Sequence, residues 1–327
     1  MGEDLFWAIR GGGGTSFGIL LAFKLELITV PETVTVFNVS KTLDENATHL
    51  VHRWQYIADK IDENLTLKLL LKSIRSRMHG NMTVQASFTS LYLGRVHELL
   101  LIMEEKFPEL GLIEQDCTEM SWIESILYFA GLKDESLDIL LSRSPAGVFD
   151  RIYFKAKSDY ARQSIPVSGL IGIWRFLHEE AENIAELQFS PYGGAMSSYS
   201  ESETPFAHRA GNIFMIQYAV AWTRPGNGEL KSHVNWIRRL YNYMTPYVSK
   251  NPRAVYFNYR DLDLEMNNQG NTSYAQASVW GLKYFGNNFN RLVRVKTKVD
   301  PSNFFRNEQS IPPLSSWYNK DIRRWSS

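Results

Sequence analysis

A serine between glycines is the first group in the chain whose spacing could support chemistry. Residues 11–18 read GGGGTSFG, and Gly14-Thr15-Ser16-Phe17-Gly18 fits the G-x-S-x-G pattern of a hydrolase nucleophile. In hydrolases that turn follows a strand and precedes a helix. Here the order is reversed, because residues 4–10 favour a short helix capped by Asp4 and residues 17–30 favour a strand. No histidine follows His233, which further weakens the case for a catalytic triad.

Two other glycine motifs fail in the same stretch. A G-x-G-x-x-G motif has no consistent frame there, and a phosphate-binding P-loop needs a lysine, the first of which is Lys24. A loop with so little side-chain bulk lets backbone N–H groups approach a ligand closely. A cofactor loop and a plain glycine-rich connection therefore both remain open.

Composition narrows the class of protein. A length of 327 residues predicts about two domains. The 9 Trp, 16 Tyr and 18 Phe favour a large sheet core or an aromatic-lined pocket. Zero formal net charge, with no run of Lys or Arg longer than two, argues against a nucleic-acid partner.

Targeting, disulfide and metal signals are weak. The apolar runs are far shorter than the roughly 20 residues of a membrane span, and residues 1–4 lack the basic start of a signal peptide. Cys117 is the only cysteine, which rules out an intrachain disulfide. His49 and His52 have no third ligand nearby, so no metal site is predicted. N-x-S/T glycosylation sequons occur at Asn38, Asn46, Asn64, Asn81 and Asn271.

The remaining elements follow from periodicity. Helices are expected at 47–61, 95–107, 121–130, 169–183, 228–244 and 273–285. Strands are expected at 33–40, 67–73, 83–89, 151–157, 185–190, 212–222 and 254–259, with a loop-like tail at 298–314. Such an arrangement predicts an α+β fold with a sheet covered by helices on one face.

Four stretches carry a resemblance to a known family. They are MGEDLFWAIRGGGGTSFGI at 1–19, PYGG at 191–194 with PFAHRAG at 205–211, YFNYRDLD at 256–263, and VWGLKYFGNNFNRLVRVKTKVDPSNFFRNEQ at 279–309. Together they resemble the plant berberine bridge enzyme-like FAD-linked oxidoreductases, flavoproteins of the vanillyl-alcohol-oxidase type. The resemblance runs over essentially the whole chain.

The resemblance implies a division of the chain. Residues 1–31 would be the last segment of a PCMH-type FAD-binding domain whose remainder is missing. Residues 32–257 would be an α+β substrate-binding domain, an antiparallel sheet backed by helices. Residues 258–327 would return to the FAD domain.

The resemblance also implies how FAD is held. Gly12, Gly13, Gly14, Ser16, Phe17, Gly18 and Ile19 would pack their backbone against FAD, which makes Ser16 a loop residue. Asn258, Tyr284 and Asn288 are further candidate flavin contacts, with simple helix packing as the alternative for Tyr284. The family holds its flavin covalently through a histidine and a cysteine of the N-terminal domain. No histidine precedes His49 and Cys117 falls in the substrate domain, so the chain is expected to bind FAD weakly or not at all.

The implied reaction is oxidation of an alcohol. A hydride would pass from a carbohydrate or a monolignol-type phenolic alcohol to flavin N5, and O2 would reoxidise the flavin. Tyr259 matches the catalytic base, Gln217 supports it, and Tyr192 and Met215 lie toward the substrate. Many relatives carry a lysine in place of Met215, and a thioether cannot favour tyrosinate as that cation would.

Two hypotheses remain for this chain. It is either a truncated oxidoreductase of a family secreted to the apoplast or sent to the vacuole, or a flavin-free remnant that binds a small molecule through Tyr192, Gln217 and Tyr259. Without partner strands, residues 17–30 and the tail beyond Phe285 should expose apolar surface.

Overall fold

The chain forms two compact units in the computed structural model, which describes residues 2–76, 80–143, 152–180, 184–223, 226–268 and 272–314. The first unit combines Met1–Glu26, Met196–Gly211 and Ser249–Ser327, and the second combines Leu27–Ala195 and Asn212–Val248. The segment at 196–211 therefore belongs with the two ends of the chain. That these units correspond to an FAD domain and a substrate domain stays a proposal.

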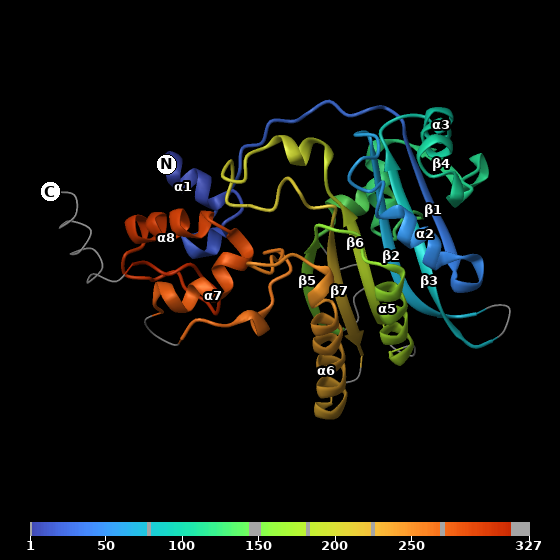
Figure 1. Cartoon of the computed structure of the whole chain (residues 1–327). Helices are drawn as coiled ribbons and strands as arrows, with labels where there is room; N and C mark the ends of the chain where they lie inside the picture. The colour runs from blue at the N-terminus through green and yellow to red at the C-terminus, as the bar shows by residue number, and fades with distance from the viewer. Residues whose placement is uncertain are drawn as a thin grey trace. The chain divides into compact units, whose positions relative to one another are not determined.

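The second unit is built on a seven-stranded antiparallel sheet (Figure 1). Its strands, in spatial order, are β4 (Cys117–Met120), β1 (Val34–Thr42), β3 (Met82–Tyr92), β2 (Leu65–Arg75), β6 (Ile184–Pro191), β7 (Phe214–Trp222) and β5 (Tyr153–Ala161). Its α-helices are α2 (Ala47–Trp54), α3 (Val96–Lys106), α4 (Trp122–Phe129), α5 (Val167–Glu179) and α6 (Asn227–Tyr243). The predicted α+β class with an antiparallel sheet is confirmed.

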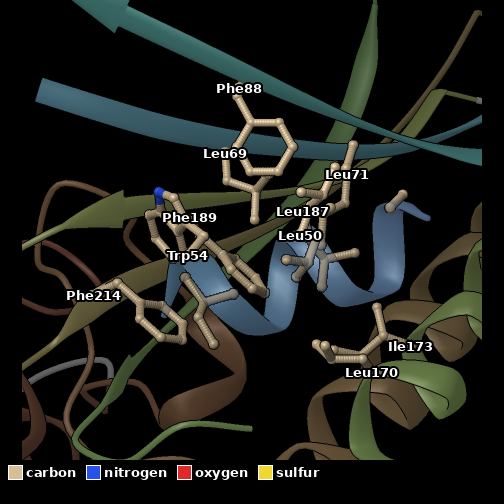
Figure 2. Close-up of a cluster of buried hydrophobic side chains, with 14 of the residues drawn as sticks. Leu50, Trp54, Leu69, Leu71, Phe88, Leu170, Ile173, Leu187, Phe189 and Phe214 are labelled. Carbon is tan, nitrogen blue, oxygen red and sulfur yellow. The ribbon is translucent and has the colours of Figure 1, made fainter. Parts of the chain in front are cut away.

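The core of this unit lies between one face of the sheet and the helices α2, α5 and α6. Side chains from alternate positions of β2, β3, β6 and β7 point toward Leu50 and Trp54 of α2, and Leu170 and Ile173 of α5 join the same cluster (Figure 2). The period of two along each strand sends the neighbouring side chains to the opposite face. That second face is therefore the one available for a site.

The first unit packs three helices around a smaller aromatic core. They are α1 (Glu3–Ile9), α7 (Tyr274–Phe285) and α8 (Asn288–Val299). Gly281 of α7 lies against Phe289 of α8, where an added Cβ would come within 2.3 Å of the ring. Glycine at this position lets the two helices approach closely.

The predicted strand at 17–30 is wrong. Residues 18–31 have no regular secondary structure, and Leu21, Leu27 and Ile28 are 93%, 91% and 83% exposed. The apolar alternation needs a neighbouring strand to complete its hydrogen bonds, and the described residues provide none. The expected exposure of this apolar surface is confirmed.

Other sequence predictions fail for reasons of packing. Beyond Phe285 the chain forms α8, which buries Phe289 and Leu292, so the exposure expected there is largely absent. The strand expected at 254–259 is a loop whose first residue, Ala254, is buried. The helix α8 and the short strand β4 were not predicted.

The cap predicted for the first helix is also wrong. The N-cap of α1 is Gly2, and Asp4 bonds to Arg291 rather than to the backbone. None of the helices in the described ranges combines the length and apolar character needed to cross a membrane.

Candidate cofactor and substrate site

The glycine-rich loop, residues 11–19, leaves the end of α1 and contains a short 3₁₀ turn at Gly14–Ser16. Gly11 and Gly13 have φ of +132° and +83°, a region that side chains disfavour. A Cβ at Gly12 would lie 2.4 Å from the carbonyl oxygen of Ala8, and one at Gly13 would lie 2.9 Å from the ring of Phe257. The packing of the chain itself thus requires glycine at both positions.

The far end of the loop is open. A Cβ at Gly18 would meet no atom within 4 Å, and Ile19 is 77% exposed. The N–H groups of Ser16, Phe17 and Gly18 are used inside the loop, since they donate to Gly13 and Gly14 carbonyls. A ligand would therefore approach the loop at Gly18 and Ile19.

Ser16 is a structural residue of this loop. Its side chain is buried, and its Oγ accepts a hydrogen bond from the Ile311 backbone N–H at 3.2 Å. Its carbonyl oxygen accepts from Lys296 Nζ at 2.6 Å. The hydroxyl is thus neither exposed nor paired with a base, and neighbouring Phe17 is buried as well.

Lys296 of α8 holds the loop against the C-terminal segment. Its fully buried ammonium also donates to Asp300 Oδ2 and to the Phe305 carbonyl, both at 2.6 Å. Burial lowers the pKa of Lys296, while the bond to Asp300 acts in the opposite direction. Burial by itself would raise the pKa of Asp300, but Lys296 and the Phe304 and Phe305 N–H groups outweigh it and lower that pKa. The ion pair therefore ties three segments together.

Tyr259 lies in the loop that follows Phe257, and its side chain is half-buried. Its ring packs edge-on against Tyr256, with 5.1 Å between the centroids. Burial and the Tyr256 phenol raise the pKa of Tyr259. The adjacent Asn258 is exposed, and its Nδ2 donates to Tyr256 Oη at 2.8 Å.

Tyr284 and Asn288 use their polar atoms inside the first unit. Tyr284 Oη accepts from the Asp261 N–H at 2.9 Å and donates to Gln309 Oε1 at 3.2 Å, and burial raises its pKa to about 12. Asn288 Nδ2 donates to the Glu201, Thr204 and Pro205 carbonyls at 2.6, 3.1 and 3.3 Å. These contacts explain both residues by packing, and a flavin contact through them remains a prediction.

Tyr192, Met215 and Gln217 belong to the second unit. Met215 and Gln217 lie on the sheet face opposite α2, α5 and α6, because the alternate residues Phe214, Ile216 and Tyr218 enter the core. Tyr192 follows β6, and its Oη lies 3.3 Å from Tyr160 Oη.

This face carries polar residues that sequence reasoning missed. The strand register places Gln217 opposite Ser158 of β5 on one side and Gln188 of β6 on the other. In the next row Met215 lies opposite Tyr160 and Ser190. The alternation within each predicted strand indicates which residues share a sheet face. Only the pairing of the strands shows which of them lie side by side in a row.

The remaining candidates, the Cys117 thiol and possible metal ligands, are poorly suited to catalysis or metal binding. Burial, with help from Asp116 and Glu114, raises the pKa of Cys117 to about 11, so its thiol is a poor nucleophile at neutral pH. Within the described ranges no three His, Cys, Asp or Glu side chains gather as metal ligands.

Comparison with known proteins agrees with these features. The family model "Berberine and berberine like" matches residues 255–312. The tetrahydroberberine oxidase of Berberis wilsoniae is 50% identical over 317 residues, which is 97% of this chain and 59% of that protein. The berberine bridge enzyme-like 23 protein of Arabidopsis thaliana is 50% identical over 96% of this chain and 57% of its own length. The chain belongs to the berberine bridge enzyme-like family.

Solved structures support the same assignment. BBE-like #28 from Arabidopsis thaliana matches 96% of this berberine bridge enzyme-like chain and 63% of its own, with 46% identity and a TM-score of 0.89. Phl p 4, a grass pollen allergen with glucose dehydrogenase activity, matches with 42% identity and a TM-score of 0.86, over 96% of this chain and 61% of its own. The resemblance identified from sequence motifs is confirmed, and the chain spans less than three-fifths of the length of the curated relatives named above.

Proposed function

We propose that this chain carries the substrate face and the candidate base of an FAD-linked oxidoreductase that oxidises the alcohol group of a small molecule, with O2 as the final acceptor. One observation supports this most strongly. The glycine-rich loop packs on Phe257, two residues before Tyr259, although more than 240 residues of sequence separate them. The candidate cofactor loop and the candidate base thus share one unit.

The residues of the loop fit a flavin in part. The open space at Gly18, the exposed Ile19 and the exposed Asn258 are available to it, whereas Gly12 is buried against the chain. When bound, FAD would supply a hydride acceptor. Gly18, Ile19 and Asn258 would hold it. Because no histidine precedes His49 and Cys117 lies on β4, we expect this binding to be non-covalent and weak.

Tyr259 would take the proton from the substrate hydroxyl. Its pKa is raised, so the phenol is protonated at neutral pH and works as a base only with help. The family resemblance assigns that help to Gln217, whose amide both donates and accepts hydrogen bonds, and because Gln217 belongs to the other unit this role stays a prediction. Met215 is a thioether and adds no positive charge.

The substrate class follows from the sheet face in the second unit. Tyr192 provides an aromatic ring with a hydroxyl, and Gln188 and Gln217 provide amides, whereas Tyr160 and Ser158 of the same rows are buried. Such a surface suits a hydroxyl-bearing molecule, either a sugar or a monolignol-type phenolic alcohol. Relatives named for both kinds of activity exist, among them monolignol oxidoreductase AtBBE-like 13 from Arabidopsis thaliana, 47% identical over 95% of this chain and 57% of its own length.

Exposed sequons support a further part of the proposal, that the family member is a secreted or vacuolar glycoprotein. Asn38, Asn46, Asn64 and Asn81 are all exposed, as an attached glycan requires. Asn271 lies outside the described residues.

The second candidate is a flavin-free small-molecule binder. The bonded N–H groups of Ser16, Phe17 and Gly18 favour it, because they already donate within the loop and are not free to bind a flavin diphosphate. An anaerobic titration separates the two functions. The chain is mixed with excess FAD, then with glucose or coniferyl alcohol, and the flavin absorbance near 450 nm is followed.

Bleaching that requires both the chain and an alcohol supports the oxidoreductase. Alcohol binding by calorimetry without any bleaching supports the binder. A yellow chain whose flavin survives acid precipitation would contradict the expectation of weak, non-covalent binding.

A further inference from the structure

A cavity lies in the first unit, apart from the glycine-rich loop and Tyr259. Its volume is about 490 Å³. Asp4 of α1, one side of α8 and Leu314 form its wall. None of these residues belongs to the proposed cofactor or substrate sites.

The cavity carries an excess of positive charge. Arg291, Arg294 and Lys298 contribute three cations, and Asp4 contributes the single carboxylate, which leaves two positive charges in excess. Asp4 Oδ1 accepts from Arg291 Nε at 3.2 Å and from Nη2 at 2.8 Å. The Arg291 guanidinium also lies 4.1 Å from the centre of the Trp7 ring, so Arg291 already has its partners.

Arg294 and Lys298 are left to the cavity. They lie four residues apart on α8, which brings their side chains together on one side of the helix. Within the described residues neither makes an ion pair, although the charges of both, after the hydrogen bond from Arg291, help to lower the pKa of Asp4. Two like charges at this spacing repel each other, and a bound dianion would remove that repulsion.

The rest of the wall limits the chemistry of a ligand. Thr297 Oγ1 donates to the Val293 carbonyl at 2.7 Å and accepts from the Leu314 N–H at 2.8 Å, so its hydroxyl is engaged. Leu314 adds apolar surface, and the almost fully buried Val295 adds a small part of it. An arginine fork beside a lysine recognises phosphate oxygens, and the apolar surface suits an attached organic group.

We propose that this cavity binds a small organic phosphate, with Arg294 and Lys298 on the phosphate group and Val295 and Leu314 on the organic part. This goes beyond alcohol oxidation, and it does not depend on flavin or on Tyr259.

Calorimetry on the full chain tests the proposal. Phenyl phosphate and inorganic phosphate are titrated at pH 8, where both are dianions, with NaCl matched for ionic strength in the blank. We expect saturable binding, tighter for phenyl phosphate. R294Q/K298Q should raise Kd at least about tenfold, while K68Q, which removes an exposed lysine on β2, should change it less than about twofold.

A gain of affinity gives a second readout that misfolding cannot imitate. D4N removes the carboxylate and frees Arg291, so it should lower the Kd for phenyl phosphate several-fold. Heats equal to the NaCl blank, or unchanged binding in R294Q/K298Q, would overturn the site. Inorganic phosphate binding as tightly as phenyl phosphate would overturn the organic ligand. Flavin bleaching does not measure phosphate binding, so the failure of this proposal can be distinguished from the failure of the oxidoreductase proposal.

Discussion

Tyr259, as the proposed base, would determine the pH dependence of an oxidation by this chain. Burial and Tyr256 raise its pKa above the ordinary value near 10, and the active form of a base is the deprotonated one. With FAD supplied, the initial rate of alcohol-dependent bleaching should rise as pH increases from 7 toward 10. A rate that is flat or falls over this range would mean that Tyr259 is not the base.

Replacement of Tyr259 gives the matching prediction. Y259F removes the proposed proton acceptor and should slow bleaching about 10²- to 10⁴-fold, the usual contribution of a general base. Y56F, at an exposed tyrosine of the second unit, is the control and should keep the rate. Stopped-flow absorbance measures both, and equal rates in the two variants would remove Tyr259 from the mechanism.

Lys296 is the residue whose loss should cost the most stability. K296M leaves Asp300 buried without its cation and the Ser16 and Phe305 carbonyls without their donor, so the free energy of unfolding should fall by about 3–5 kcal/mol. K298M, on the same helix but exposed, should change it by about 0.5 kcal/mol or less. Urea unfolding of the two variants side by side measures the difference, and similar midpoints would refute this role.

The site residues show where motif reasoning succeeds. The glycine-rich loop and the Asn258-Tyr259 segment are contiguous motifs, and the structure brings them into one unit. Ser158, Gln188 and Tyr160 escaped prediction because their shared row depends on strand register, which short-range patterns do not contain. A flavin contact through Asn288 stays a prediction, and the three carbonyls that its side chain bonds are not indicated by any motif.

At the scale of elements, periodicity predicted the helices and strands that have an amphipathic pattern and a neighbouring element to pack against. Strands β1, β2, β3, β6 and β7 and the helices α5 and α6 lie close to their expected ranges because one face of each enters a common core. Residues 17–30 have the pattern without a neighbouring strand, and they form no strand. Helix α8 is rich in polar and basic residues, so its sequence resembles a loop, and no side-chain hydrogen bond caps its start. Its buried stripe becomes evident only where it packs on α7.

The contact between α7 and α8 supports a prediction at this scale. G281A would place a methyl group 2.3 Å from the Phe289 ring and should lower the free energy of unfolding by about 1–3 kcal/mol. G228A, at an exposed helical glycine of α6 with no atom near its added Cβ, should raise it by about 0.5–1 kcal/mol. Thermal unfolding followed by circular dichroism should give opposite signs, and matching shifts would contradict the packing argument.

At the scale of the whole molecule, the exposed segment at 18–30 is the main liability for solubility. Five of its large apolar side chains are at least 75% exposed, namely Ile19, Leu21, Leu25, Leu27 and Ile28. L21D/L27D should reduce both the fluorescence of a hydrophobic dye and self-association in light scattering, because it adds charge to an apolar segment in which only Lys24 and Glu26 are charged. L141D, at an exposed leucine of a different and shorter segment, should change both much less, and equal effects would place the association elsewhere on the surface.

The glycines of the loop also bear on how such sequences evolve. A Cβ at Gly12 or Gly13 would collide with Ala8 or Phe257, which are present whether or not a flavin is bound, whereas a Cβ at Gly18 would meet no atom of the chain. A lineage that had abandoned redox chemistry would keep the glycine run for as long as it kept the fold. Substitution of Gly18 would be the earlier sign that a lineage has lost its cofactor. Genome surveys that take the sequence GGGG as proof of a working oxidase would therefore overestimate the number of such enzymes.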